Sequence, residues 1–239
     1  MRCTKLCDAN VIENNKHIFE RERCTFCGRC ESVCPQKAFE TAGIDLAPEE
    51  IAAELLKDEI FMKNSGGGVT FSGGEPLMQA ELCVQIVKLL KERNINIAID
   101  TSAAVSRTAI DAVLPYVDTF LIDIKAINEE VHIHCTGASN KNILDNIRYV
   151  DSVGKQIEIR YPYVPTMNDD EWEGIADFIL KLKNIKIVRI LPYHNYAERK
   201  YRCLGLSYLL PDIPIPSLSQ VSSIAERMKL LGLGNVVVG

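Results

Sequence analysis

Short apolar runs alternate with helical stretches along most of the chain, from about Ile44 to the carboxyl terminus. Each apolar run is continuous, which is typical of parallel strands that are buried on both faces. We predict five strands, near residues 68–72, 97–101, 119–123, 156–160 and 186–191. Helices are predicted before, between and after them, near residues 48–63, 77–93, 107–114, 141–153, 169–183 and 217–231. This alternation indicates an α/β protein with a parallel sheet.

Local residue choices support two of the helix starts. Pro48, followed by two glutamates, suits a first helical turn, because that turn lacks N–H partners and its dipole end is positive. Asn168 and the two aspartates after it offer a cap for the helix near residues 169–183. Periodicity leaves two architectures open, an open doubly wound sheet and part of a barrel. Either one places its chemistry at the carboxyl ends of the strands.

The first 42 residues differ from the rest because they are rich in cysteine and short of helical periodicity. We therefore expect an N-terminal segment over residues 1–42 and an α/β domain over residues 43–239. Six of the nine cysteines fall within the first 34 residues, whereas Cys83, Cys135 and Cys203 stand alone. The three isolated cysteines are interpreted as small buried apolar residues.

Composition and charge narrow the function classes. The chain has 27 Lys and Arg residues and 32 Asp and Glu residues. The basic residues form no cluster that could neutralise a row of phosphates, so we expect no nucleic-acid partner. No apolar stretch approaches the ~20 residues that span a bilayer, and the first residues lack the apolar core of a signal peptide. We therefore expect a cytoplasmic protein with no membrane partner. A reduced compartment disfavours disulfides, so the N-terminal cysteines are candidates for metal ligation.

The densest cysteine run has the pattern C-x2-C-x2-C-x3-C-P over residues 24–35. It resembles the bacterial ferredoxin motif, in which thiolates hold a [4Fe–4S] cluster. A zinc site would usually show two separated C-x2-C pairs. The spacing therefore favours iron–sulfur ligation over zinc.

In two-cluster ferredoxins the fourth cysteine of a run ligates the other cluster, so this run needs a distant partner. The cysteines predicted to hold one complete cluster are Cys7, Cys24, Cys27 and Cys30. The other two, Cys3 and Cys34, would supply half of a second cluster, and a hairpin would connect residues 7 and 24. A competing interpretation takes Cys3 and Cys7 as the start of a C-x3-C-x2-C radical-initiating motif. It is disfavoured because Asn10 stands at the third position.

Polar residues end or follow all five predicted strands, on the side expected for an active site. They are Ser72, Gly73, Gly74, Glu75, Asp100, Thr101, Asp123, Lys125, Arg160 and His194. Glycines let a backbone edge approach a ligand closely, and Glu75 could pair with an ammonium group. Asp123 and Lys125 share one face, where they could hold the two charged ends of an amino acid. Taken singly, these features would also suit a tight turn and an ordinary ion pair.

Several segments resemble one family, in the family's order along the chain. They are GGGVTFSGGEPLMQ (66–79), FLIDIK (120–125), NEEVH (128–132) leading to TGASN (136–140), IRYPYVP (159–165) and ILPYH (190–194). Together they are similar to the activating enzymes of glycyl radical enzymes, including those of pyruvate formate-lyase, within the radical S-adenosylmethionine superfamily. The cysteine-rich segment looks like the ferredoxin-like insert found in members other than the simplest pyruvate formate-lyase activators.

The resemblance implies a partial TIM-like barrel of six β/α units that binds S-adenosylmethionine. The residues implied in binding it are Ser72, Gly73, Gly74, Glu75, Asp100, Thr101, Asp123, Ile124, Lys125, Arg160 and His194. A second segment, with Asn128, His132 and Gly137, is implied to receive a loop of a partner, a glycyl radical enzyme. The implied reaction is an oxidoreduction: reductive cleavage of S-adenosylmethionine, then removal of hydrogen from a glycine Cα of the partner. Electrons would come from a donor such as flavodoxin or ferredoxin through the [4Fe–4S] clusters.

The sequence departs from the family at one point. No strand with a C-x3-C-x2-C loop precedes the cysteine-rich segment, and five strands are predicted where the family has six. We therefore expect an N-terminally truncated activating enzyme that lacks its first strand, with residues 68–72 as an apolar edge. Two alternatives are a non-catalytic iron–sulfur electron carrier and a module that binds S-adenosylmethionine or a partner without turnover. An electron carrier has no use for the Gly-Gly-Glu turn or for charged strand ends.

We predict that the chain as written does not cleave S-adenosylmethionine, because the three thiolates of the radical-initiating motif are absent from it. The measurement is 5′-deoxyadenosine released by protein that has been reconstituted with iron and sulfide and reduced with dithionite. A stoichiometric yield would contradict the prediction.

Overall fold

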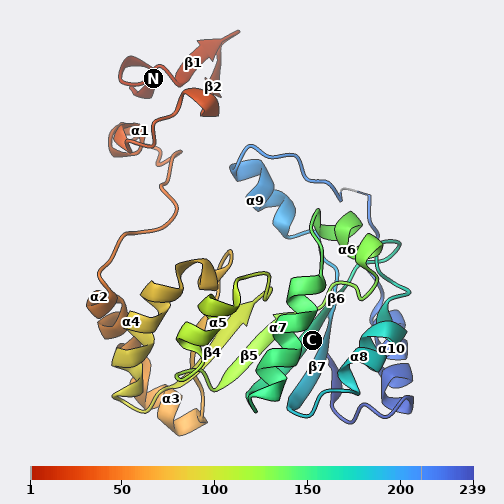
Figure 1. The fold of residues 1–239 in the computed structure, drawn as a ribbon. Coiled ribbons are helices and arrows are strands. Elements are labelled where there is room, and N and C mark those ends of the chain that lie inside the picture. Colours follow the sequence, from red (N-terminus) through yellow and green to blue (C-terminus); the bar gives the residue numbers. More distant parts are fainter. Residues whose placement is uncertain (1, 211) are drawn as a thin grey trace. The chain divides into compact units, whose positions relative to one another are not determined.

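The computed structural model describes residues 2–210 and 212–239 and divides into two compact units (Figure 1). The cysteine-rich unit comprises the residues up to Leu46 together with Arg199–Ser207. The sheet unit comprises Ala47–Glu198 and Tyr208–Gly239. The first boundary thus falls after residue 46 rather than 42, and a stretch from late in the chain joins the cysteine-rich unit. Among the described residues, no helix combines the length and apolar character needed to cross a membrane.

The sheet unit is built on six parallel strands whose order in the sheet follows their order in the sequence. They are β3 (Gly68–Phe71), β4 (Asn96–Thr101), β5 (Thr119–Asp123), β6 (Gln156–Tyr163), β7 (Ile185–Pro192) and β8 (Val236–Val238). A doubly wound sheet reverses its strand order at a switch point, and this sheet does not. The architecture is therefore the partial barrel, one of the two alternatives that periodicity left open.

All five predicted strands are present, but the prediction of only five is wrong, because β8 adds a sixth. Its three valines were missed because a run of that length is too short for a periodicity test. Strand β3 pairs with β4 from Gly68 to Phe71 and forms one edge of the sheet, as expected. Strand β8 forms the other edge.

The predicted helices are also present, with different bounds. They are α2 (Pro48–Leu55), α3 (Glu59–Ser65), α4 (Ala80–Lys91), α5 (Arg107–Val113), α7 (Lys141–Ser152), α8 (Trp172–Ile179) and α10 (Leu218–Leu230). A short 3-10 turn, Leu56–Asp58, precedes α3, and another, Pro76–Gln79, precedes α4. Among the described residues, three helices escaped prediction, α1 (Arg29–Val33), α6 (Glu129–Thr136) and α9 (Ala197–Cys203). Figure 1 shows α4, α5 and α7 ranged along one face of the sheet.

The two predicted helix starts have opposite outcomes. Helix α2 begins at Pro48, and the carboxylate of Glu50 accepts a hydrogen bond from the Ala47 amide at 2.9 Å, as acidic residues in a first turn do. Helix α8 begins only at Trp172 and has no side-chain cap, so the prediction that Asn168 or one of the two aspartates after it caps this helix is wrong. Asn168 lies in the preceding loop.

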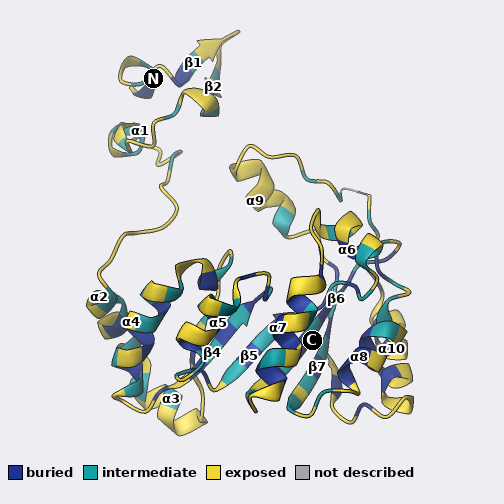
Figure 2. Ribbon diagram, in the orientation of Figure 1, coloured by how far each residue is buried: buried dark blue, intermediate teal, exposed yellow. Residues whose placement is uncertain are grey.

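Burial alternates along the central strands. Residues such as Phe120, Ile122 and Ile159 are at most 1% exposed and pack beneath the helices, whereas the residues between them are half-buried (Figure 2). The expectation of burial on both faces therefore holds for one face only. The other face is the inner surface of an incomplete barrel, and charged side chains from several strands lie on it.

The cysteine-rich unit contains an antiparallel hairpin of β1 (Asn10–Glu13) and β2 (Lys16–Phe19), which is the connection expected between residues 7 and 24. A short helix, α1 (Arg29–Val33), and the 3-10 turns Cys3–Lys5 and Arg21–Arg23 complete it. Arg21 donates a hydrogen bond to the Cys203 carbonyl at 2.5 Å, which ties the late stretch to this unit. The ferredoxin-like character of the segment stays a prediction.

Candidate active site

Arg160 on β6 joins two carboxylates on the neighbouring strands. Its Nε donates to Asp123 Oδ1 on β5 at 2.7 Å, its Nη1 donates to Asp100 Oδ2 on β4 at 2.8 Å, and its Nη2 donates to Asp100 Oδ1. The three side chains are 18–22% exposed. Burial acts to lower the pKa of Arg160, but its hydrogen bonds and charge interactions with Asp100 and Asp123 outweigh burial and raise it. The guanidinium therefore remains charged and holds three strands together at their carboxyl ends.

Two further predicted residues reach the same network. Lys125 Nζ donates to Asp123 Oδ2 at 3.2 Å, and Ser72 Oγ donates to Asp100 Oδ2 at 3.3 Å. An ammonium group has three N–H donors. Among the described residues, the Lys125 ammonium makes one hydrogen bond, to Asp123. Its side chain is 34% exposed, so this amine is accessible to an anionic ligand.

Glu75 fixes the Gly-Gly-Glu turn to the neighbouring strand end. Its Oε1 accepts from Thr101 Oγ1 at 2.7 Å and from the Leu77 amide at 3.2 Å. Its Oε2 accepts from the amide and hydroxyl of Ser102 at 2.9 and 2.7 Å. The carboxylate thus has four donors from its own chain, and the expected pairing with an ammonium group is not needed to satisfy it.

Gly73 and Gly74 leave space beside the backbone at this turn. Gly73 has a φ of +130°, which favours glycine. A Cβ built on either glycine would meet no atom within 4 Å, so the chain's own packing does not exclude a side chain there. The open backbone edge, beside a network of both charges, fits a small zwitterionic ligand such as the methionine part of S-adenosylmethionine.

Two residues implied by the resemblance stand apart from the network. The Ile124 side chain is 1% exposed and belongs to the core, and only its amide takes part, by donating to the Arg160 carbonyl at 2.9 Å. His194 is exposed and stacks on Tyr196 at a centroid distance of 4.3 Å. Among the described residues, no hydrogen bond joins His194 to Arg160 or its carboxylates.

The segment implied in partner binding forms α6. Asn128 Oδ1 caps this helix by accepting from the amides of Glu130 and Val131, and Gly137, with a φ of +77°, ends it. His132 is 4% exposed, and its Nδ1 lies 2.8 Å from the Ala138 carbonyl oxygen. The His132 ring thus closes the turn after α6, and its role in partner binding stays a prediction.

Several of the N-terminal cysteines are influenced by neighbouring charges and hydrogen bonds. The charges of Cys7 and Cys24 act on Cys30, whose pKa is raised mainly by burial. Hydrogen bonding to Arg29 at 3.3 Å lowers the pKa of Cys27 to about 7. Thiolate is the form that ligates metal, so this donor set suits an iron–sulfur cluster.

Cys3 and Cys34 line a cavity of about 380 Å³ together with His17 and Phe39. His17 Nε2 lies 3.9 Å from Cys3 Sγ and 2.9 Å from Asn10 Oδ1. Within residues 2–210 and 212–239, no three Cys, His, Asp or Glu side chains are gathered as ligands of a single ion. Both cluster assignments stay predictions.

A cavity of about 620 Å³ lies at the opposite end of the sheet, where the strands begin. It is lined by residues 66–70, 96–98, 117–119, 154–156 and 186. Active sites of β/α barrels lie at the carboxyl ends of strands, whereas the amino-terminal face serves stability. We therefore assign the site by its charged residues rather than by cavity size.

The structure adds residues that sequence reasoning missed. Ser102 bonds Glu75, and Asn140, Asn168 and Glu171 bond the backbone that follows β5. Asn140 and Asn168 are 2% and 3% exposed, and burial of amides is the signal that marks them. Burial is not visible in a single sequence.

Comparison with known proteins identifies the family. A model described as the radical SAM superfamily matches residues 20–179. The pyruvate formate-lyase 2-activating enzyme of Escherichia coli is 32% identical over 99% of this chain and 84% of its own length. The trans-4-hydroxy-L-proline dehydratase activating enzyme of Clostridioides difficile is 34% identical, over 93% and 84%.

A solved structure extends the similarity to three dimensions. The crystal structure of a domain of the pyruvate-formate lyase-activating enzyme from Bacteroides vulgatus has a TM-score of 0.61 and 28% identity. The match covers 72% of this chain and 99% of that domain. The parallel sheet with sequential strand order and the charged strand ends are consistent with these matches. The chain belongs to the radical SAM superfamily and, within it, to the activating enzymes of glycyl radical enzymes.

Proposed function

We propose that this chain binds S-adenosylmethionine at the carboxyl ends of β3–β6 and serves in activating a glycyl radical enzyme. The observation that carries the proposal is the network of Ser72, Asp100, Asp123, Lys125 and Arg160, which four strands place together beside an open glycine backbone. An electron carrier would have no use for this arrangement. The family membership supports the same function.

Charge and hydrogen-bonding capacity suggest how the ligand would lie. The Lys125 ammonium, with donors to spare, suits the methionine carboxylate, and Arg160 adds positive charge next to it. The backbone of Gly73 and Gly74 suits the amino group, since carbonyl oxygens accept from an ammonium and no side chain obstructs them. Asp100, Asp123 and His194 are proposed to lie near the rest of the nucleoside. Thr101 and Glu75 are proposed to hold the turn in place.

The partner is proposed to be a glycyl radical enzyme whose loop meets the α6 region, at Asn128 and Gly137. The relatives named above activate different enzymes, a pyruvate formate-lyase and a dehydratase, so the identity of the partner is left open. In the activation reaction a reduced [4Fe–4S] cluster held by a C-x3-C-x2-C loop would supply the electron that breaks a carbon–sulfur bond of S-adenosylmethionine, and this sequence contains no such loop. The cysteine-rich unit is proposed to hold clusters that receive electrons from flavodoxin or ferredoxin in the cytoplasm, where the nine free thiols would persist.

Calorimetry tests the ligand assignment. Anaerobically reconstituted protein is expected to bind S-adenosylmethionine, and Lys125→Ala is expected to weaken binding about tenfold, because a charge-assisted hydrogen bond contributes roughly 1.5–3 kcal/mol. Lys229→Ala removes a lysine on α10 that pairs with Glu226 at 2.9 Å, and serves as the matched control with unchanged affinity. Absence of binding to the unaltered protein, or equal affinity in Lys125→Ala, would refute the assignment.

Iron analysis tests the cluster grouping. Mössbauer spectra of the reconstituted chain are expected to show one intact [4Fe–4S] cluster, which Cys7→Ser removes, because Cys7 is assigned to the complete ligand set. The expectation that Cys203 is buried is wrong, because this cysteine is exposed. Cys203→Ser alters a cysteine outside the six N-terminal ones and is expected to leave the spectrum unchanged. Two intact clusters per chain would contradict the grouping.

A further inference from the structure

A four-residue segment, Lys125 to Asn128, connects the proposed ligand site to the proposed partner surface. Lys125 lies just beyond the end of β5, and Asn128 caps α6. In the sheet a strand's backbone groups bond to neighbouring strands, but this segment has left the sheet. Its amides and carbonyls, which range from buried at Ala126 to exposed at Asn128, therefore take other partners.

Three side chains from distant parts of the chain supply those partners. Asn168 Nδ2 donates to the Lys125 carbonyl at 2.7 Å. Asn140 Nδ2 donates to the carbonyls of Ala126 and Ile127 at 3.0 and 2.9 Å. Glu171 Oε2 accepts from the amides of Ile127 and Asn128 at 2.7 and 2.9 Å. We call Asn140, Asn168 and Glu171 the backbone clamp.

Asn168 also ties the segment to β6, the strand that carries Arg160. Its Nδ2 donates to the Pro162 carbonyl at 2.8 Å and its Oδ1 accepts from the Val164 amide at 2.8 Å. The Tyr161 hydroxyl donates to the Asn168 carbonyl. The backbone that carries Lys125 and the end of the strand that carries Arg160 are thus held by one buried amide.

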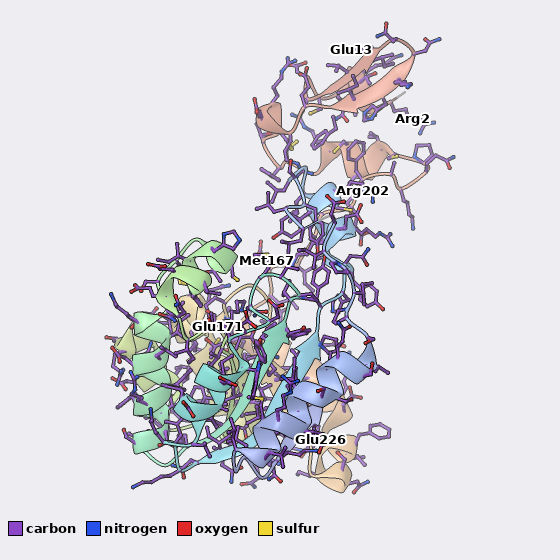
Figure 3. All side chains as sticks on the ribbon, turned by 90° about the vertical axis from the view of Figure 1, so that its right-hand side faces the viewer. Arg2, Glu13, Met167, Glu171, Arg202 and Glu226 are labelled. Atoms are coloured by element: carbon purple, nitrogen blue, oxygen red, sulfur yellow. The ribbon has the colours of Figure 1, made fainter. Side chains whose placement is uncertain are left out.

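Glu171 reaches the segment from the loop between β6 and α8, on which Figure 3 labels Met167 and Glu171. One carboxylate oxygen, Oε2, accepts from both amides that precede α6. Glu171 therefore fixes where this helix begins. The Lys125 ammonium and the first turn of α6 are therefore carried on one segment with little freedom to move independently.

We propose that Asn168 and Glu171 are positioning residues for S-adenosylmethionine: they hold the backbone of Lys125 where its ammonium meets the ligand carboxylate, and the start of α6 in fixed relation to it. This inference rests on the proposed function, because it needs a ligand at Lys125. It assigns roles to two residues that bond the backbone of this segment and not the charged side chains of the network.

The test compares two substitutions at Glu171. Glu171→Gln keeps an oxygen that accepts from both amides, whereas Glu171→Ala removes it, and both remove the charge. Calorimetry with S-adenosylmethionine is expected to show affinity about fivefold weaker for Glu171→Ala and within about twofold of the unaltered protein for Glu171→Gln, as expected when one of two hydrogen-bonded groups is left unpaired. Hydrogen exchange at the amides of Ile127 and Asn128 is expected to be faster only in Glu171→Ala.

A double-mutant cycle shows whether Glu171 acts through Lys125. In a Lys125→Ala background, Glu171→Ala is expected to change the affinity less than twofold, because the group that it positions is gone. Full additivity of the two effects, or unchanged affinity in Glu171→Ala while Lys125→Ala weakens binding, would overturn the positioning role and leave the ligand assignment standing. Failure of the unaltered protein to bind would overturn both.

Discussion

The site depends on one constraint, the neutralisation of two carboxylates by Arg160. Asp100 and Asp123 stand on adjacent parallel strands and face the inner surface of the incomplete barrel, where like charges would repel each other. The guanidinium has a planar fork of donors and bonds both, which a lysine amine would not reproduce. Lys125 and Ser72 join this network, so the charged ends of four strands form one arrangement. That arrangement, and not an open cavity, defines the candidate site.

Each part of the site is then fixed by neighbouring backbone. Glu75 holds the glycine turn to the end of β4, and the backbone clamp holds the segment after β5. The Lys125 ammonium and the backbone of Gly73 and Gly74 remain accessible to a ligand. The ammonium suits an anionic group, and the glycine carbonyls suit a cationic one. The proposed partner surface at α6 begins at the same clamped segment. The proposed ligand site and the proposed partner surface are therefore neighbours on one chain.

Much of the fold was predictable, because five apolar runs between helical stretches indicate a parallel sheet. The sixth strand was too short to be recognised, and α6 was missed because its residues lack an amphipathic pattern. Eight polar residues and two glycines at strand ends were predicted from position alone, and five of the polar residues form the charged network. Asn168 was interpreted as a helix cap because Asn favours that role, but its amide is buried and serves three backbone groups. The buried ring of His132 closes the turn after α6, and its partner role stays a prediction. The role of Asn168 depends on contacts with residues in other elements, which a single sequence does not reveal.

The most direct test is a crystal structure of the reconstituted protein with S-adenosylmethionine, because it shows at which end of the sheet the ligand binds. We expect the methionine carboxylate at Lys125 and the amino group at the backbone of Gly73 and Gly74, at the carboxyl ends of the strands. Density for the ligand in the 620 Å³ cavity at the amino-terminal ends, or anywhere remote from Lys125, would contradict it.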